Sequence, residues 1–309
     1  MLTEFSLIDK FFKKLALKNP ETRLGIGDDC ALLSIPDGFE LAITTDTMVE
    51  NVHFFADANP KQLGHKLLAV NLSDLAAMGA NPLAVTLALT LPKIDENWLR
   101  EFSDGFLNLA QLYHVDLIGG DTTKGALTLT VQAMGLIPKG KALKRSTAKV
   151  GDLIFMTGFL GDAGLGLKIK QGFDSKSQNA LARFHAPMPR VEIGLTLRNC
   201  ANSCIDISDG LASDLGHILK QSHVGATLDF DKLLLSADVK NYIEKTGDDL
   251  MPLLAGDDYE LCFTVSPEFK NSVPENCTEI GIIESELGLR LKKAKQITTL
   301  TTKGYEHFS

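Results

Sequence analysis

Aspartates recur in six short polar segments of this 309-residue chain, and their carboxylates are the groups best suited to chemistry. The segments are Gly25–Asp29, Thr44–Thr47, Asn71–Asp74, Gly119–Thr123, Asp206–Gly210 and Gly256–Tyr259. Each is expected to be a loop beside an apolar stretch, and together they supply many oxygen donors and almost no imidazole or thiolate. Hard cations such as Mg²⁺ prefer this donor set, with phosphate oxygens and water completing the coordination. The pattern favours a site in which Mg²⁺ offsets the charge of a bound phosphate.

Each segment taken alone also has an ordinary structural explanation. Asp and Ser often cap helices, and Gly-Asp pairs often form turns. Asp74 and Asp209 are the strongest candidates for helix caps, because each follows a Ser before an Ala/Leu-rich stretch. Asp46 and Asp121 each end an apolar stretch and have neighbouring threonines that a plain turn would not require. The occurrence of all six segments in one chain favours the functional interpretation.

Several classes of protein are disfavoured by composition and motif content. The sequence has no P-loop, no Gly-x-Gly-x-x-Gly, no His-Glu-x-x-His and no Gly-x-Ser-x-Gly. Its 31 basic and 39 acidic side chains give a net charge of −8, which disfavours nonspecific nucleic-acid binding. The longest apolar stretch, Leu83–Leu91, is far shorter than the roughly 20 residues that span a bilayer, and no secretory signal pattern opens the chain. We therefore expect a cytoplasmic protein with reduced thiols and with neither nucleic acid nor membrane as partner.

Apolar periodicity predicts helices and strands in both halves of the chain. The expected helices are 5–15, 60–79, 95–113, 161–171, 177–184, 190–201 and 211–221. The expected strands are 31–35, 41–45, 83–91, 115–118, 127–137, 153–157, 204–207 and 259–265. These elements predict an α/β (α+β) protein with two domains, and the turn residues of Pro138–Lys141 mark the best boundary. The stretches Asn71–Ala77 and Asp206–Ala212 resemble each other, which indicates a duplication or simply two similar helix caps.

With their neighbours, the acidic segments form six longer motifs, which are Gly-Ile-Gly-Asp-Asp-Cys-Ala, Thr-Thr-Asp-Thr, Ala-Val-Asn-Leu-Ser-Asp-Leu-Ala-Ala-Met-Gly-Ala, Leu-Ile-Gly-Gly-Asp-Thr-Thr, Asp-Ile-Ser-Asp-Gly-Leu and Gly-Asp-Asp-Tyr-Glu-Leu. In the order and spacing of these motifs, the chain resembles the thiamine-monophosphate kinase family of the aminoimidazole-ribonucleotide-synthetase-like superfamily. The similarity extends from Phe5 to Gly304–Phe308, essentially the whole chain.

The resemblance implies a specific fold, reaction and assembly. Residues 1–138 would form an ATP- and Mg-binding domain that pairs with a second copy into a dimeric β-barrel, and 139–309 a C-terminal α/β sandwich domain. The homodimer would use several Mg²⁺ ions to transfer the ATP γ-phosphoryl group to thiamine monophosphate, which gives thiamine diphosphate.

The site residues that the resemblance implies fall into three groups. The metal-binding positions are Asp29, Thr44, Thr45, Asp46, Asp74, Asp121, Asp206 and Asp209. The ATP-contacting positions are Gly120, Asp121, Arg145 and Ser208. The substrate-contacting positions are His53, Asp257 and Tyr305.

The chemistry needs no catalytic protein nucleophile, because phosphoryl transfer relies on alignment and charge neutralisation and the acceptor phosphate is already ionised. Asp257 is a shorter carboxylate than the Glu usual in the family, which shortens its reach toward the thiamine cation. Arg145 can stabilise the transferring group or lie on the surface beside the linker. His53 can donate to a phosphate or be an ordinary loop residue, and Tyr305 can stack on the thiamine rings or seal a core edge.

Two other functions are compatible with the acidic segments. One is an ATP-dependent synthetase of the same superfamily that activates an amide or formyl oxygen of another small substrate. The other is a non-catalytic sensor of Mg²⁺-nucleotide. ATP turnover that depends on thiamine monophosphate separates the kinase from both.

Overall fold

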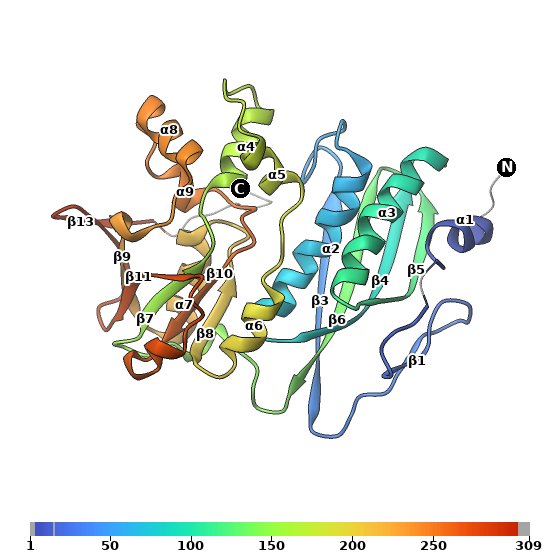
Figure 1. Ribbon diagram of the computed structural model, residues 1–309, viewed down its shortest axis with the longest axis horizontal. Helices are drawn as coiled ribbons and strands as arrows, with labels where there is room; N and C mark the ends of the chain where they lie inside the picture. The colour runs from blue at the N-terminus through green and yellow to red at the C-terminus, as the bar shows by residue number, and fades with distance from the viewer. Residues whose placement is uncertain (1–3, 15, 302–309) are drawn as a thin grey trace. The chain divides into compact units, whose positions relative to one another are not determined.

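The computed structural model describes residues 4–14 and 16–301 and divides into two α/β units. The N-terminal unit comprises Met1–Leu75 and Ala80–Gly140, and the C-terminal unit comprises Ala76–Gly79 and Lys141–Ser309. The chain therefore passes from one unit to the other within the turn-rich Pro138–Lys141 segment. Figure 1 shows the elements of each unit.

A four-stranded sheet forms the centre of the N-terminal unit. Its strands in spatial order are β3 (Phe39–Val49), β6 (Thr128–Pro138), β4 (Asn81–Leu91) and β5 (Asp116–Lys124). The first three strands pair antiparallel, and β5 joins β4 in parallel. The strands β3 and β5 are the edges of an open sheet, so the described residues of one chain form no closed barrel.

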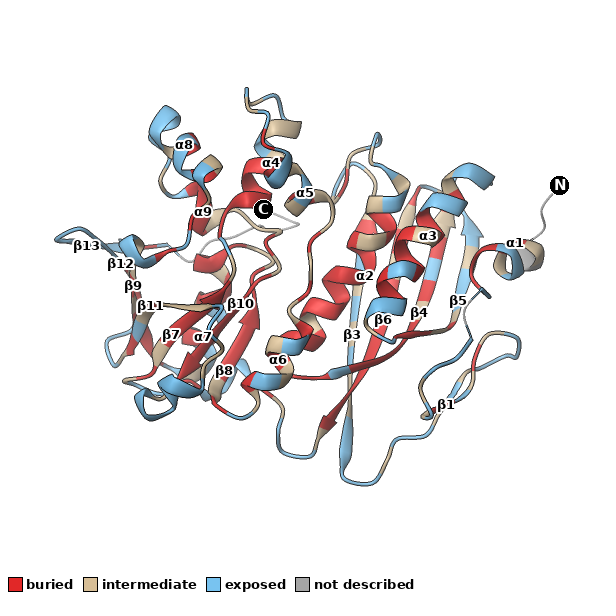
Figure 2. Cartoon of the chain, in the orientation of Figure 1, coloured by how far each residue is buried: buried red, intermediate tan, exposed pale blue. Residues whose placement is uncertain are grey.

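The helices α2 and α3 pack against one another and against this sheet. The remaining N-terminal elements are α1 (Glu4–Phe11), β1 (Thr22–Leu24), β2 (Leu32–Leu33), α2 (Pro60–Ala77) and α3 (Glu96–Leu112). Helix α2 approaches α3 so closely that a Cβ on Gly64 would lie 2.2 Å from the carbonyl oxygen of Phe102. Most of α2 and of the central strands is buried (Figure 2), which explains why the sequence of α2 shows no clear polar face.

The C-terminal unit is built on a seven-stranded mixed sheet in the order β13-β12-β9-β11-β7-β10-β8. Its strands are β7 (Leu153–Thr157), β8 (Ala201–Asp206), β9 (Gly225–Asp229), β10 (Leu261–Val265), β11 (Cys277–Glu284), β12 (Gly288–Lys293) and β13 (Gln296–Leu300). Its helices are α4 (Asp162–Lys170), α5 (Gln178–His185), α6 (Val191–Leu197), α7 (Leu211–Ser222), α8 (Ala237–Thr246) and α9 (Met251–Leu254), with 3₁₀ turns at Arg145–Thr147, Phe230–Lys232 and Pro267–Ser272. Strand β9 pairs with β12 in parallel, and the other neighbours pair antiparallel.

The core of this unit is formed by apolar side chains from the sheet and from α7. Strands β7, β8 and β10 contribute Ile154, Ile205 and Cys262, while α7 contributes Leu215 and Ile218. All five side chains are at most 1 % exposed. This core fixes the carboxyl end of β8 and the start of α7, which border the Asp206–Gly210 segment.

Candidate active site

In the N-terminal unit, an acidic pair lies on a strand and a helix. Asp46 lies within β3 and Asp74 within α2. The side-chain hydroxyl of Thr44 donates to the Asp74 carboxylate at 2.5 Å, which joins the two elements. Burial raises the pKa of Asp46 to about 6, and the neighbouring negative charge of Asp74 adds to the shift. Two carboxylates therefore face one another across the strand–helix contact.

The alternation of side chains along β3 separates the predicted metal positions of this segment. Thr44 and Asp46 are half-buried, whereas Ile43, Thr45 and Thr47 are exposed. Side chains two residues apart share a face of a strand, so Thr44 and Asp46 point to the same side. The side chain of Thr45 points to the other side, and only its backbone remains near the acidic pair.

Asp121 lies in β5, and the structure does not bring it to this pair. Register places Asp46 opposite Val131, Val131 opposite Leu87, and Leu87 opposite Gly120. Asp121 is thus about three strand spacings, roughly 14 Å, from Asp46 along the sheet. Gly120 is required where β5 approaches β4, since a Cβ there would lie 1.9 Å from the Leu87 carbonyl oxygen.

The two remaining predicted residues of the N-terminal unit lie in turns. Asp29 is exposed, and its backbone N–H donates to the Asp28 carboxylate at 2.9 Å. The Nδ1 atom of His53 accepts the backbone N–H of Val49 at 3.0 Å. In a neutral ring this contact leaves the proton on Nε2, so the ring can donate from its other nitrogen.

In the C-terminal unit, three carboxylates surround the start of α7. Asp206 is buried at the end of β8, Asp209 is half-buried, and Asp214 is buried in the first turn of α7. The Asp214 carboxylate accepts the backbone N–H of Asp209 at 3.0 Å. Burial raises the pKa of Asp214 to about 8, and the charges of Asp206 and Asp209 contribute. Sequence reasoning missed Asp214, although an acid in a first helical turn is a recognised signal for capping contacts.

A second acidic segment is hydrogen-bonded to this one through the backbone. The N–H of Asp257 donates to the Ser208 carbonyl at 2.8 Å, and the N–H of Tyr259 donates to the Ile207 carbonyl at 2.8 Å. A Cβ on Gly256 would lie 2.2 Å from the Ser208 carbonyl oxygen, so only glycine permits this approach. The Tyr259 hydroxyl also donates to the Asp257 carboxylate at 3.1 Å. The structure thus brings the predicted metal and nucleotide residues Asp206–Asp209 beside the predicted substrate residue Asp257.

Arg145 lies at the opposite end of α7 from these acids. Its carbonyl oxygen accepts the hydroxyl of Ser222, the last residue of the helix, at 2.8 Å. Twelve helical residues span roughly 18 Å, so the backbone of Arg145, an exposed residue, is well separated from Ser208 and Asp209. Tyr305 lies outside the described residues.

Both predicted helix caps, Asp74 and Asp209, are wrong. Asp74 lies in the interior of α2, where the backbone N–H groups already have helical partners. The cap of α7 is Gly210, with φ of 104°, and no side chain of that residue caps the helix. The resemblance between Asn71–Ala77 and Asp206–Ala212 therefore reflects composition, because one stretch is continuous helix and the other a strand-to-helix turn.

The acidic groups fit Mg²⁺ held jointly by protein and ligand. Among residues 4–14 and 16–301, no three His, Cys, Asp or Glu side chains are arranged to hold a metal by themselves. Mg²⁺ commonly binds through one or two carboxylates and takes its other oxygens from phosphate and water. Crowded, half-buried carboxylates such as Asp46 and Asp74 supply such a partial set, since a cation would relieve their repulsion.

Comparison with known proteins first defines the class of protein. Residues 27–137 match the AIR synthase related protein, N-terminal domain family, and residues 149–291 match the corresponding C-terminal domain family. No helix within the described part of the chain has the length and apolar character needed to cross a membrane.

Individual relatives narrow the class to one family. Thiamine-monophosphate kinase of Escherichia coli (strain K12) is 47% identical, with coverage of 99% of this chain and 98% of its own length. The crystal structure of thiamine-monophosphate kinase from Stenotrophomonas maltophilia K279a is 40% identical, covers 94% of this chain and 96% of that one, and has a TM-score of 0.85. The structure of AaThiL complexed with AMPPCP and TMP is 32% identical, covers 99% and 97%, and has a TM-score of 0.78. The chain belongs to the thiamine-monophosphate kinase family.

Proposed function

We propose that this chain transfers the γ-phosphoryl group of ATP to thiamine monophosphate in the presence of Mg²⁺, which yields thiamine diphosphate and ADP. The structural observation that supports the proposal is the backbone hydrogen bond from Asp257 to Ser208. It joins the residue that we assign to the substrate to a residue that we assign to ATP. The relative solved with an ATP analogue and TMP supports the same pair of ligands.

The reaction is a direct displacement at the γ-phosphorus, and the acceptor phosphate itself is the nucleophile, so no protein nucleophile is needed. An oxygen of the acceptor phosphate forms the new bond to the γ-phosphorus, while the bond from that phosphorus to the β–γ bridging oxygen breaks. ADP leaves with the electron pair. Because the acceptor oxygen already carries negative charge, the site must align two anions and offset their repulsion.

The residues that would hold Mg²⁺ belong to two acidic groups. Asp46, Asp74 and Thr44 form the group on β3 and α2, and Asp206 and Asp209 form the group that precedes α7. When bound, Mg²⁺ supplies positive charge that offsets the phosphate oxygens. Asp214 holds the backbone N–H of Asp209 and so orients the second group.

The other predicted contacts remain part of the proposal. They are Asp29, Thr45 and Asp121 for metal, Gly120, Asp121, Arg145 and Ser208 for ATP, and His53, Asp257 and Tyr305 for the substrate. Asp257 is the carboxylate we assign to the cationic end of thiamine.

The proposal includes a homodimer formed through residues 1–138. Strand β3 is an 11-residue edge strand with Phe39 38% and Ile43 57% exposed. Long apolar edges are usually covered, and pairing two four-stranded sheets around a two-fold axis would cover these. Residues 139–309 would form the C-terminal domain, which contains the Asp206–Gly210 and Gly256–Tyr259 segments.

The proposed reaction is tested by incubating the protein with Mg-ATP and thiamine monophosphate and separating the products chromatographically. We expect equal amounts of thiamine diphosphate and ADP, with no product when Mg²⁺ is chelated. Thiamine in place of its monophosphate serves as the matched control, since it lacks the acceptor phosphate. ADP release without thiamine diphosphate would overturn the proposal in favour of another superfamily reaction, and no ATP turnover would favour a sensor.

A further inference from the structure

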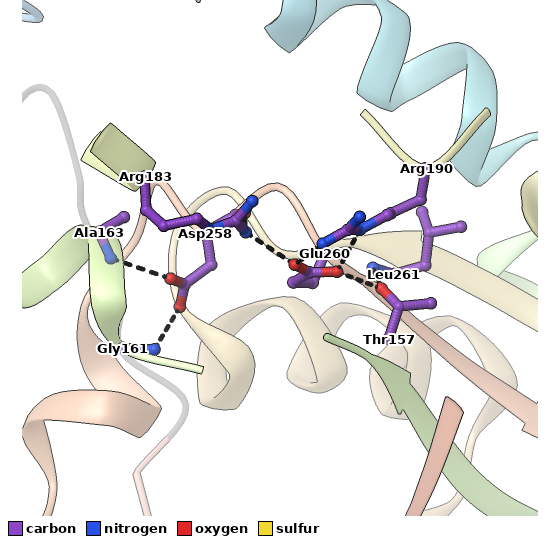
Figure 3. Close-up of polar contacts among 8 residues, drawn as sticks. All are labelled: Thr157, Gly161, Ala163, Arg183, Arg190, Asp258, Glu260 and Leu261. Atoms are coloured by element: carbon purple, nitrogen blue, oxygen red, sulfur yellow. Dashed lines mark hydrogen bonds and ion pairs between the residues drawn. The ribbon is translucent and has the colours of Figure 1, made fainter. Parts of the chain in front are cut away.

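A fully buried glutamate, Glu260, lies directly after the Gly256–Tyr259 segment and has four hydrogen-bond donors (Figure 3). The Nε and Nη2 atoms of Arg190 approach its carboxylate at 2.7 and 2.5 Å. The Nη2 atom of Arg183 donates at 2.7 Å and the hydroxyl of Thr157 at 2.5 Å. Two cations and a hydroxyl therefore saturate one carboxylate at 0% exposure.

The segment beside Glu260 has a strained backbone. Asp257 and Tyr259 have φ values of 69° and 49°, in the left-handed region that non-glycine residues seldom occupy. Such conformations are unfavourable for non-glycine residues and persist only where surrounding contacts hold them. The contacts that hold these two residues must therefore be strong.

Side chains of the segment alternate between a buried and an open side. Asp258 and Glu260 are fully buried, while Asp257 and Tyr259 are half-buried. On the buried side, the Asp258 carboxylate accepts the backbone N–H groups of Gly161 at 2.8 Å and Ala163 at 3.2 Å. Contacts on the buried side thus determine how Asp257 is presented on the open side.

One arginine nitrogen connects Glu260 to this backbone. The Nη2 atom of Arg183 donates both to the Glu260 carboxylate and to the carbonyl oxygen of Asp258, each at 2.7 Å. The backbone carbonyl of Glu260 accepts the N–H of Ile207 at 2.7 Å, immediately before Ser208. Glu260 thus contacts both segments that the proposed reaction requires.

We propose that Glu260 is a positioning residue, which through Arg183 holds the strained Gly256–Tyr259 segment so that Asp257 faces the substrate. This inference rests on the proposed function, because it assigns Asp257 to the thiamine cation. A simple stabilising ion pair is a weaker account, since buried ion pairs often add little net stability compared with apolar replacements.

The kinetic test uses Glu260→Gln, which preserves the shape of the side chain and removes its charge. We expect the KM for thiamine monophosphate to rise about tenfold or more, because loss of a residue that orients a ligand-binding group typically lowers affinity by such a factor. The KM for ATP should change less. In an Asp257→Ala background, Glu260→Gln should add almost nothing to that KM, because both changes act through the same contact.

Asp152→Asn provides a matched control within the same sheet. Asp152 is also buried and accepts hydrogen bonds from Asn202 at 2.9 Å and Thr264 at 3.1 Å. Asp152 directly precedes β7, whereas Thr157, which contacts Glu260, is the last residue of that strand. The control therefore perturbs a similar hydrogen-bond network at the opposite end of β7. Equal KM values in Glu260→Gln and Asp152→Asn, or additive effects of Glu260→Gln and Asp257→Ala, would overturn the positioning role.

Hydrogen exchange gives a readout that does not depend on turnover. The N–H groups of Asp257 and Tyr259 should exchange at least about tenfold faster in Glu260→Gln than in the Asp152→Asn control. If the wild-type protein makes no thiamine diphosphate, the proposed function fails, yet this measurement still decides whether Glu260 holds the segment. Unchanged exchange would show that it does not.

A cavity beside the arginines supplies a second variant in case Glu260→Gln fails to fold. A space of about 330 Å³ is lined by Arg183, Arg190, Phe159 and Asn179, among others, and leaves the Arg183 side chain 17% exposed. Guanidinium ion should enter this space and restore at least part of the substrate affinity lost in Arg183→Ala. Methylammonium, which lacks the planar donors, should restore less. Equal rescue by both ions would contradict the bridging role of Arg183.

Discussion

Replacement of Gly256 by alanine tests the contact between the two acidic segments of the C-terminal unit. The φ of Gly256 is not in the positive range, so its backbone conformation alone does not exclude alanine. The added Cβ would lie 2.2 Å from the Ser208 carbonyl oxygen, whereas ordinary contacts begin at 3.4 Å. The segments must separate by about 1 Å, which would break the 2.8 Å bond from Asp257 to Ser208.

The destabilisation expected for Gly256→Ala follows from the steric clash and from the lost hydrogen bond. Overpacking costs about 1–3 kcal/mol, and the hydrogen bond contributes roughly 0.5–1.5 kcal/mol. We expect Gly256→Ala to lower the free energy of unfolding by about 2–4 kcal/mol. A displacement of about 1 Å near the reacting groups can lower a rate about a hundredfold, so kcat/KM for thiamine monophosphate should fall by up to that factor.

Urea denaturation measures the stability of the variant, and formation of thiamine diphosphate measures its turnover. The control is Gly172→Ala, where φ is 102° and no atom lies within 4 Å of the added Cβ. This substitution should cost about 1–2 kcal/mol through backbone strain alone and leave both Michaelis constants unchanged. Wild-type kinetics in folded Gly256→Ala would refute our account of the segment contact.

Three further predictions concern the acidic pair, the substrate carboxylate and the sheet edge. Asp46→Asn and Asp74→Asn should each lower kcat about a hundredfold or more without loss of thermal stability, and normal turnover at limiting Mg²⁺ would contradict a metal role. Asp257→Ala should raise the KM for thiamine monophosphate about tenfold or more, because a charged hydrogen bond contributes roughly 1.5–3 kcal/mol. Asp257→Glu should shift the same constant, with the KM for ATP as the internal control in both variants; unchanged constants would remove Asp257 from the site. Ile43→Lys, at a residue 57% exposed on β3, should convert a homodimer into monomers in light scattering, and a wild-type monomer at micromolar concentration would already disprove the dimer.

Elements with a regular apolar pattern could be predicted closely from the sequence. The predicted strand 153–157 is β7, and the predicted helix 60–79 is α2 (Pro60–Ala77). The region from Gly225 onward was mostly missed, because β9, β11, β12 and β13 mix buried positions with half-buried or exposed ones and show no clear apolar run. Their order in the sheet depends on tertiary pairing that no local pattern encodes.

The acidic residues themselves show where sequence reasoning fails. The sequence predicted a strand over 41–45 that ends before Asp46, yet β3 continues to Val49 because β6 pairs with it along its whole length. The polar side chains Thr44 and Asp46 face α2, where an apolar residue is normally expected. A half-buried carboxylate on a strand therefore resembles a loop residue when only the sequence is considered.

The structure holds the pair Asp46 and Asp74 in a different way from Asp257, and this difference has a kinetic consequence. Asp46 and Asp74 lie on a regular strand and a buried helix, whose hydrogen bonds fix them without help from a particular side chain. Asp257 lies on a strained segment whose conformation depends on a few buried contacts made by Asp258 and Glu260. Changes to the buried groups that contact this segment, such as Arg183 and Glu260, should therefore alter substrate affinity, whereas a change at Asp152 should not. Changes around β3 and α2 should alter turnover mainly when they touch the carboxylates directly.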